Sequence, residues 1–188
     1  MKIIKLGLIS ILATGALYAG TYKVDTAHSY VGFKVKHMMV SNVKGNFEKF
    51  EGVIEYDEAS KTLKALKGII DVASINTANE KRDTHLKAED MFNAAKYPTI
   101  TFEVIKVEEE NVYGNLTMHG VTKEVKLELE ESGLGKDAWG NQKVGLSLEG
   151  KINRKDFGIT WNKLLEAGGV AVSDEVKLEL ELAGVLQK

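Results

Sequence analysis

Apolar and polar residues alternate with a period of two along most of the chain after residue 20. Val31, Phe33 and Val35 occupy one set of alternate positions, and Lys34 and Lys36 occupy the other. This alternation is typical of β-strands that turn one face to a core and the other to water. It predicts strands over residues 22–25, 30–37, 43–56, 63–75, 99–107, 111–120, 125–130, 144–152 and 176–182.

One interval lacks this period. Residues 79–95 are rich in Glu, Lys, Arg, Leu, Ala and Met and contain few β-branched residues. Asn79 can cap the start of a helix, and Tyr97-Pro98 would end it. We therefore expect one helix or two short helical turns between the strands.

The expected fold class is all-β. About eight antiparallel strands with an apolar and a polar face fit a closed up-and-down barrel, because closure removes exposed sheet edges. A sandwich of two sheets is the structural alternative.

Three glycines bear on whether such a barrel is hollow. A barrel of about eight strands can be filled by side chains or can leave room for one small ligand. Gly68, Gly114 and Gly150 share faces with inward apolar residues, so they would leave open volume in the lumen. Alternatively, they relieve strand bending at barrel corners. Because the inward residues are Val, Leu, Ile, Phe and Met, a ligand there would have to be long and apolar.

The first 19 residues have the features of a secretory signal peptide. Lys2 and Lys5 open it, residues 6–19 are almost wholly apolar, and Ala19-Gly20 supplies small residues at a cleavage site. The run is shorter than the roughly 20 residues of a membrane span. We expect cleavage after Ala19 and one domain, residues 20–188, in the periplasm without a membrane anchor.

Composition excludes several functional classes. The chain has no Cys, which excludes thiol catalysis and cysteine-based metal sites, and its net charge of −2 argues against nucleic acid as a partner. The histidines at 28, 37, 85 and 119 lack metal-binding spacing. No catalytic residues are assigned, although Ser29 beside His28 keeps a hydrolase or other enzyme acting on a lipid-like substrate as an alternative.

Short motifs in a fixed order resemble the YceI-like polyisoprenoid-binding family along essentially the whole chain after the leader. They include Asp25-Thr26-Ala27-His28-Ser29, Arg82-Asp83-Thr84-His85-Leu86, Met91-Phe92, Tyr97-Pro98-Thr99, Gly114-Asn115-Leu116-Thr117-Met118-His119-Gly120, Arg154-Lys155-Asp156-Phe157-Gly158 and Val172-Ser173-Asp174. Met91 stands where the family more often has Phe. The resemblance implies a lipocalin-like eight-stranded antiparallel β-barrel with a short helical segment between strands, in an exported bacterial protein. It also implies that an isoprenoid, quinone-like or fatty-acyl chain is held in the lumen.

Polar residues expected at the mouth are candidates for contact with the head group of such a ligand. They are Asp25, His28, His37, Arg82, His85, Arg154 and Asp174. His37 ends an apolar row, where a polar group needs a partner. Each of the others also has a structural alternative: a turn at Asp25 and His28, a salt bridge from Arg82 that anchors the helix, and an ion pair of Arg154 that closes the barrel, with Trp161 as a plug.

The ligand tail is expected to contact Val31, Phe33, Val35, Leu86, Phe92, Phe102, Gly114, Leu116, Met118, Leu146, Leu148, Phe157 and Trp161. No metal and no cofactor other than the bound lipid are expected. The sequence thus favours a periplasmic lipid-binding protein that sequesters or carries a long-chain amphiphile. A stress-protective interaction protein is the third alternative, and a homodimer is left open.

Overall fold

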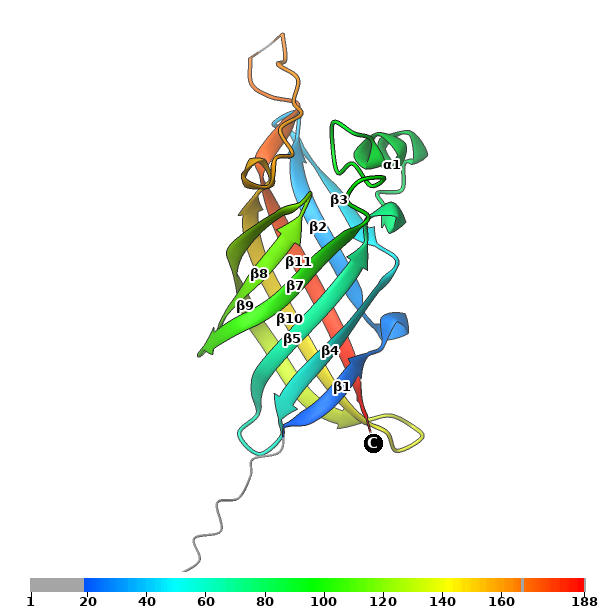
Figure 1. Ribbon diagram of the computed structural model, residues 1–188, viewed down its shortest axis with the longest axis vertical. Helices are drawn as coiled ribbons and strands as arrows, with labels where there is room; N and C mark the ends of the chain where they lie inside the picture. The colour runs from blue at the N-terminus through cyan, green and yellow to red at the C-terminus, as the bar shows by residue number, and fades with distance from the viewer. Residues whose placement is uncertain (1–18, 167, 188) are drawn as a thin grey trace, which may run out of the picture.

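The computed structural model describes residues 19–166 and 168–187, so the predicted signal peptide lies outside the described residues except for Ala19. An antiparallel sheet curls into a barrel, and a single α-helix of the described chain lies beside one end of it (Figure 1). The strands are β1 (Gly20–Val24), β2 (Tyr30–His37), β3 (Ser41–Phe47), β4 (Phe50–Asp57), β5 (Thr62–Asp71), β6 (Ile75–Asn76), β7 (Thr99–Glu108), β8 (Asn111–Met118), β9 (Val121–Lys136), β10 (Gln142–Asn153) and β11 (Val172–Leu186). The helix is α1 (Glu80–Lys87), and short 3-10 turns are η1 (Thr26–His28), η2 (Val72–Ser74) and η3 (Arg154–Phe157).

The barrel closes because its first and last strands pair. The ring runs β1-β4-β5-β7-β8-β9-β10-β11, and Tyr22 of β1 stands opposite Leu186 of β11 to complete it. Strands β2, β3 and β6 continue the sheet beyond β11, in that order. This confirms the predicted eight-stranded antiparallel barrel, and the alternative of a two-sheet sandwich is wrong.

Two of the expected strands, over residues 43–56 and 63–75, are each broken into two pieces, which are β3 and β4 and then β5 and β6. Asp25 accepts a hydrogen bond from the Ala27 amide and starts the turn η1 between β1 and β2. Asp71 does the same for the Ala73 amide at η2, between β5 and β6. The turn at η1 agrees with the separate strands predicted over residues 22–25 and 30–37, whereas period-two alternation persists across η2 and across residues 48–49, so the sequence pattern predicted continuous strands there.

The two ends of the barrel are built differently. At the end that carries β1 and the C-terminus, the ring of hydrogen-bonded strands is complete. We call this the closed end. At the opposite end the sheet stops at β6, and within the described residues no strand pairs with the outer edge of β6. Residues 77–98, which include α1, span the gap between β6 and β7 there (Figure 1). We call this the mouth.

The helix begins where the sequence predicts. Asn79 caps it by accepting a hydrogen bond from the Arg82 amide at 3.0 Å. It ends at Lys87 because Ala88 is extended, and turns fill the remainder of the interval before Pro98. In the described part of the chain, no helix has the length and hydropathy that a membrane crossing requires.

The closed end holds a tightly packed core. Large side chains with no exposed surface meet there, including Tyr22, Ile54 and Leu148. The Tyr22 hydroxyl donates to the Glu58 carboxylate at 2.7 Å. Burial, reinforced by that carboxylate, raises the pKa of Tyr22 to about 12. The floor of the barrel is therefore filled by side chains.

Candidate ligand cavity

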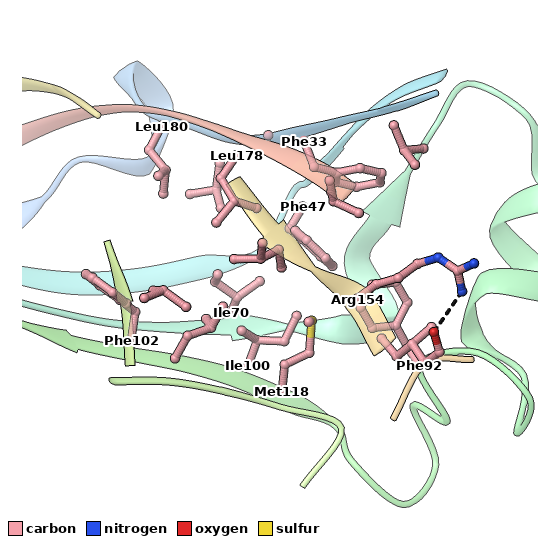
Figure 2. Close-up of a pocket in the computed structure, with 18 of the residues that line it drawn as sticks. Phe33, Phe47, Ile70, Phe92, Ile100, Phe102, Met118, Arg154, Leu178 and Leu180 are labelled. Atoms are coloured by element: carbon pink, nitrogen blue, oxygen red, sulfur yellow. Dashed lines mark hydrogen bonds between the residues drawn. The ribbon is translucent and has the colours of Figure 1, made fainter. Parts of the chain in front are cut away.

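A cavity occupies the barrel interior between the packed floor and the mouth (Figure 2). Its atom-free space, counted with the open mouth, is about 1080 Å³. Apart from Gly32 and Arg154, every residue of its wall is an apolar one.

Alternation along the strands places the wall residues. Val31, Phe33 and Val35 face inward from β2, and Leu178 and Leu180 face inward from β11. Because successive strand residues point to opposite faces, the polar residues between them face outward. Figure 2 shows side chains from several strands converging on one space, with Phe102 and Leu180 at one end and Phe92 and Arg154 at the other.

Eight of the thirteen residues predicted to meet a ligand tail line this cavity: Val31, Phe33, Val35, Leu86, Phe92, Phe102, Leu116 and Met118. The sequence reasoning did not assign Phe47, Leu66, Ile70, Met91, Ile100, Val125, Leu127, Ile152, Ile159, Val172, Val176, Leu178 and Leu180. Alternation marks most of these as inward residues, but it does not give their height in the barrel. That height decides whether an inward residue meets the cavity or the floor.

The placement of Leu146 and Leu148 in the cavity wall is wrong. Both belong to β10 but are at most 3% exposed and pack in the floor beside Val144. They precede the wall residue Ile152 by four or more positions, which is roughly 13 Å along a strand.

Gly114 does not open volume in the lumen. A Cβ placed on Gly114 would stand 2.4 Å from the Phe102 ring, so that ring already covers the glycine. Gly150 is covered in the same way by Leu127. At Gly68 the nearest atom to such a Cβ is the Glu51 carbonyl oxygen at 3.7 Å. Gly114 and Gly150 therefore make room for the Phe102 and Leu127 side chains, and these side chains line the cavity.

Aromatic rings connect the wall to the segment over the gap. Phe33 and Phe47 have ring centroids 5.9 Å apart, and Phe47 meets Phe92 edge-on at 6.2 Å. Phe92 and Met91 follow α1, and Leu86 lies on it. These three side chains line the cavity, so residues 77–98 contribute to its wall.

Arg154 is the one charged side chain in the cavity wall of the described residues. It is only 4% exposed, and burial lowers the pKa of its guanidinium group while Asp174 opposes that shift. Its Nη1 donates to the carbonyls of Ile159 at 2.7 Å and Trp161 at 2.8 Å, and its Nε donates to that of Ser173 at 3.0 Å.

The remaining nitrogen of Arg154 is held less closely. Nη2 donates to the Asp174 carboxylate at 3.4 Å and to the Val172 carbonyl at 3.5 Å, which are long for such bonds. Asp174 is 40% exposed and also pairs with Lys155 at 2.9 Å. The predicted pairing of Arg154 with Asp174 is present, and hydrogen bonds to backbone carbonyls are the shorter contacts.

Arg82 and His85 do not line the cavity. Arg82 donates from Nε to the Thr77 hydroxyl at 2.7 Å and from Nη2 to the Thr77 carbonyl at 2.8 Å. It anchors the helix as the structural alternative expected, but the partner is Thr77 and not a carboxylate. His85 contacts the Asp90 carboxylate at 3.1 Å and meets the Trp161 ring edge-on at 4.8 Å. Trp161 thus contacts α1 beside the mouth and does not line the cavity.

Asp25 and His28 lie away from the cavity, contrary to prediction. Asp25 contacts Lys143 at 2.7 Å and His28 at 2.9 Å, and the hydrogen bond from Lys143 is the main cause that lowers the Asp25 pKa. His28 is 73% exposed. Neighbouring Ser29 donates to backbone carbonyls and not to His28, so the two are not arranged as nucleophile and base.

His37 and Phe157 are also outside the cavity wall. His37 is the last residue of β2, two positions beyond the wall residue Val35, and is partly buried at the mouth. Phe157 is 1% exposed and packs in the core, and its carbonyl oxygen contacts His119 Nδ1 at 3.0 Å. Within the described residues, no three His, Asp or Glu side chains gather as a metal site.

Comparison with known proteins gives concordant matches. A family model described as the YceI-like domain matches residues 22–183. The UPF0312 protein SA2479 of Staphylococcus aureus (strain N315) is 44% identical over 160 residues, covering 84% of this chain and 93% of that protein.

Solved structures share the barrel. The Campylobacter jejuni YCEI protein is 40% identical and aligns with a TM-score of 0.68 over 87% of this chain and 96% of its own. A polyisoprenoid binding domain from Saccharophagus degradans aligns with a TM-score of 0.64 over 88% of this chain and 98% of its own. That domain is 19% identical, so the likeness concerns the fold alone.

Proposed function

Because the chain belongs to the family of YceI-like domains, we propose that its barrel binds one long-chain amphiphile and carries or sequesters it in the periplasm. The ligand class is a polyisoprenoid, quinone-like or fatty-acyl chain. The polyisoprenoid binding domain of Saccharophagus degradans, which has the same fold, supports this choice. Binding without chemical conversion is part of the proposal.

The observation that carries the proposal is the wall of the cavity. Wall residues from β2, β7, β8, β9 and β11 are apolar, and together with α1 they surround one elongated space (Figure 2). Water gains few hydrogen bonds in such a space, whereas a hydrocarbon chain leaves water by entering it. The wall therefore suits an alkyl or isoprenoid tail and not a polar metabolite.

Burial of the ligand tail provides enough free energy for binding. Each methylene removed from water contributes about 0.8 kcal/mol, so a tail of about ten methylenes gains roughly 8 kcal/mol. Ordering costs reduce this gain, and a longer tail offsets them. Affinity thus comes from the tail, and polar contacts need only orient the head.

Arg154 is the proposed contact for the head group. The Arg154 side chain belongs to the cavity wall at the end where Phe92 lies (Figure 2), and the long bonds of its Nη2 to Asp174 and Val172 leave that nitrogen able to turn toward a ligand oxygen at the mouth. A carboxylate, phosphate or carbonyl head would receive a charge-assisted hydrogen bond there. The tail would then extend toward Phe102 and Leu180.

Organic extraction of the purified protein followed by mass spectrometry tests the proposal. The expected result is a long-chain amphiphile in near-equal molar ratio with the protein. Leu178→Trp fills the cavity and should reduce the extracted lipid severalfold. Ile69→Trp adds the same ring on the exposed outer face, where Ile69 is 47% exposed, and should leave it unchanged. Absence of lipid from the wild-type protein, or equal lipid in Leu178→Trp, would contradict the proposal.

A further inference from the structure

Exposed apolar side chains gather on two loops at the mouth. The hairpin between β2 and β3 carries Met38, Met39 and Val40, which are 48%, 57% and 83% exposed. The loop between η3 and β11 carries Leu164, which is 81% exposed. Both loops lie at the end of the barrel near α1 (Figure 1). We call these four residues the apolar rim.

The two loops support each other. The Met38 amide donates to the Ala171 carbonyl at 2.8 Å. Leu164 and Val170 form a β-bridge, so the second loop is itself a small hairpin. The apolar rim is therefore built on hydrogen-bonded backbone on both sides.

The rim continues the wall of the cavity. Met38 follows the wall residue Val35 by three positions, which is roughly 10 Å along a strand. The second loop leads directly into Val172, another wall residue. An apolar molecule that leaves the cavity at the mouth thus passes beside the rim.

The turn at the tip of the first hairpin departs from local preference. Met38 and Met39 have φ of 49° and 62°, in the left-handed region, and they are the two central residues of the turn that the Val40 amide closes by donating to the His37 carbonyl at 3.2 Å. Asn and Gly are the usual residues at these positions, because a long side chain is disfavoured there. Two long apolar side chains are thus exposed to water at positions where the turn disfavours them. This choice of residues does not help folding and points to a functional role.

The hairpin that carries Met38, Met39 and Val40 is positively charged. Residues 30–47 contain Lys34, Lys36 and Lys44 and no Asp or Glu. Lys36 and Lys44 are exposed. Apolar tips flanked by lysines are the combination by which peripheral proteins insert into the interface of an anionic bilayer.

We propose that the apolar rim and the lysines behind it dock the mouth of the barrel onto the surface of an anionic phospholipid bilayer, so that a lipid passes between bilayer and cavity without crossing water. This inference rests on the proposed function. It adds the partner surface, and it identifies the four residues of the apolar rim as those that enter the bilayer.

The variant Met38→Asn with Met39→Gly tests the docking and keeps the fold. It installs the preferred turn residues, so the thermal midpoint should stay equal or rise. Co-sedimentation with vesicles of phosphatidylethanolamine and phosphatidylglycerol should fall about tenfold or more, because two of the four apolar side chains of the rim are lost. Vesicles of phosphatidylcholine alone should bind the wild-type protein severalfold more weakly, because they carry no net negative charge to attract the lysines.

Trp139→Ser is the matched control. Trp139 is 85% exposed in the loop between β9 and β10, at the closed end, so its loss should leave co-sedimentation unchanged. Equal co-sedimentation of Met38→Asn/Met39→Gly and wild type would overturn the docking. A fall as large in Trp139→Ser, or equal binding to both vesicle types, would do the same.

Uptake of a fluorescent polyene fatty acid in the absence of vesicles separates this inference from the function on which it rests. The Met38→Asn/Met39→Gly variant should take up the probe as the wild type does, because neither methionine lines the cavity. If the wild type binds vesicles but takes up no probe, the proposed function fails while the docking stands. If it takes up the probe but binds no vesicles, only the docking fails.

Discussion

The closed end and the mouth of one barrel are stabilised in different ways. At the closed end the strand ring is complete and residues such as Tyr22, Ile54 and Leu148 fill the interior. At the mouth the sheet has a gap, the interior is hollow, and Arg154 connects η3 to the following loop through backbone carbonyls. Apolar packing thus stabilises one end, and polar contacts and aromatic rings hold the other.

The same strands can form a stable barrel and still enclose a cavity. Strands β9 to β11 run the length of the barrel and belong to both ends (Figure 1). Apolar packing in the floor contributes folding free energy that the hollow part of the barrel does not contribute. The two ends should therefore respond differently to substitution.

The largest effect is expected at Arg154. Arg154→Met removes the donor to three short carbonyl contacts in a buried site, so the free energy of unfolding should fall by about 3–5 kcal/mol. Urea denaturation measures this loss. Lys155→Met is the control, because Lys155 pairs with the same Asp174 from a position that is 44% exposed and should cost at most about 1 kcal/mol. A similar small loss in both variants would mean that the mouth does not depend on Arg154.

Leucine truncation contrasts the two ends directly. Leu148→Ala leaves a void in the packed floor and should cost about 2–5 kcal/mol of unfolding free energy. Leu178→Ala enlarges a cavity that already exists, so in lipid-free protein the cost should stay near the transfer loss of about 1–2 kcal/mol. Equal losses, measured by urea denaturation of extracted protein, would argue that the interior is uniformly packed.

Gly114→Leu tests the position of the packed boundary. The new side chain would collide with the Phe102 ring and should cost about 1–3 kcal/mol of stability. Gly68→Ala is the companion variant, since a Cβ there has only the Glu51 carbonyl at 3.7 Å. It should be neutral or stabilising by up to about 1 kcal/mol. Thermal denaturation reports both, and a stable Gly114→Leu protein would show that the space beside Gly114 is open.

The smallest effect is a pH dependence at the closed end. Hydrogen bonds to its carboxylate, above all from the Ser60 amide, hold the pKa of buried Asp57 below its ordinary value of 3.8. The folded state therefore favours ionised Asp57, which adds stability above about pH 4. That stability is lost as the pH falls through the lowered folded pKa. Asp57→Asn should flatten this part of the curve of unfolding free energy against pH, and an unchanged curve would assign the acid sensitivity to other carboxylates.

Local sequence patterns predicted the wall well and the interior poorly. Alternation identified the strands and their inward faces, and Asn79 marked the start of α1, because these features depend on neighbours in sequence. The turn at Asp25 was predicted, but the break at η2 was not, since Asp71 acts through a single amide two residues away.

Residues that act across the barrel could not be placed from the sequence. Gly114 is covered by Phe102 from the neighbouring strand, and Arg154 bonds carbonyls of residues 159, 161 and 173. Asp25 finds its partner in Lys143, which is 118 positions away. Each of these contacts depends on strand register and side-chain height, neither of which an alternating pattern contains.

The gap at the mouth has a consequence for rates. The turn and helix backbone hydrogen bonds of residues 78–97 stay within that segment, which the Leu86 and Phe92 side chains fasten to the barrel from inside the cavity. Lifting the segment breaks no strand pairing, so it requires less free energy than unfolding the barrel. Its amides should exchange with solvent well before those of β10. The residence time of a molecule in the cavity would then follow the opening frequency of this segment, so that a very stable barrel could still exchange its contents quickly.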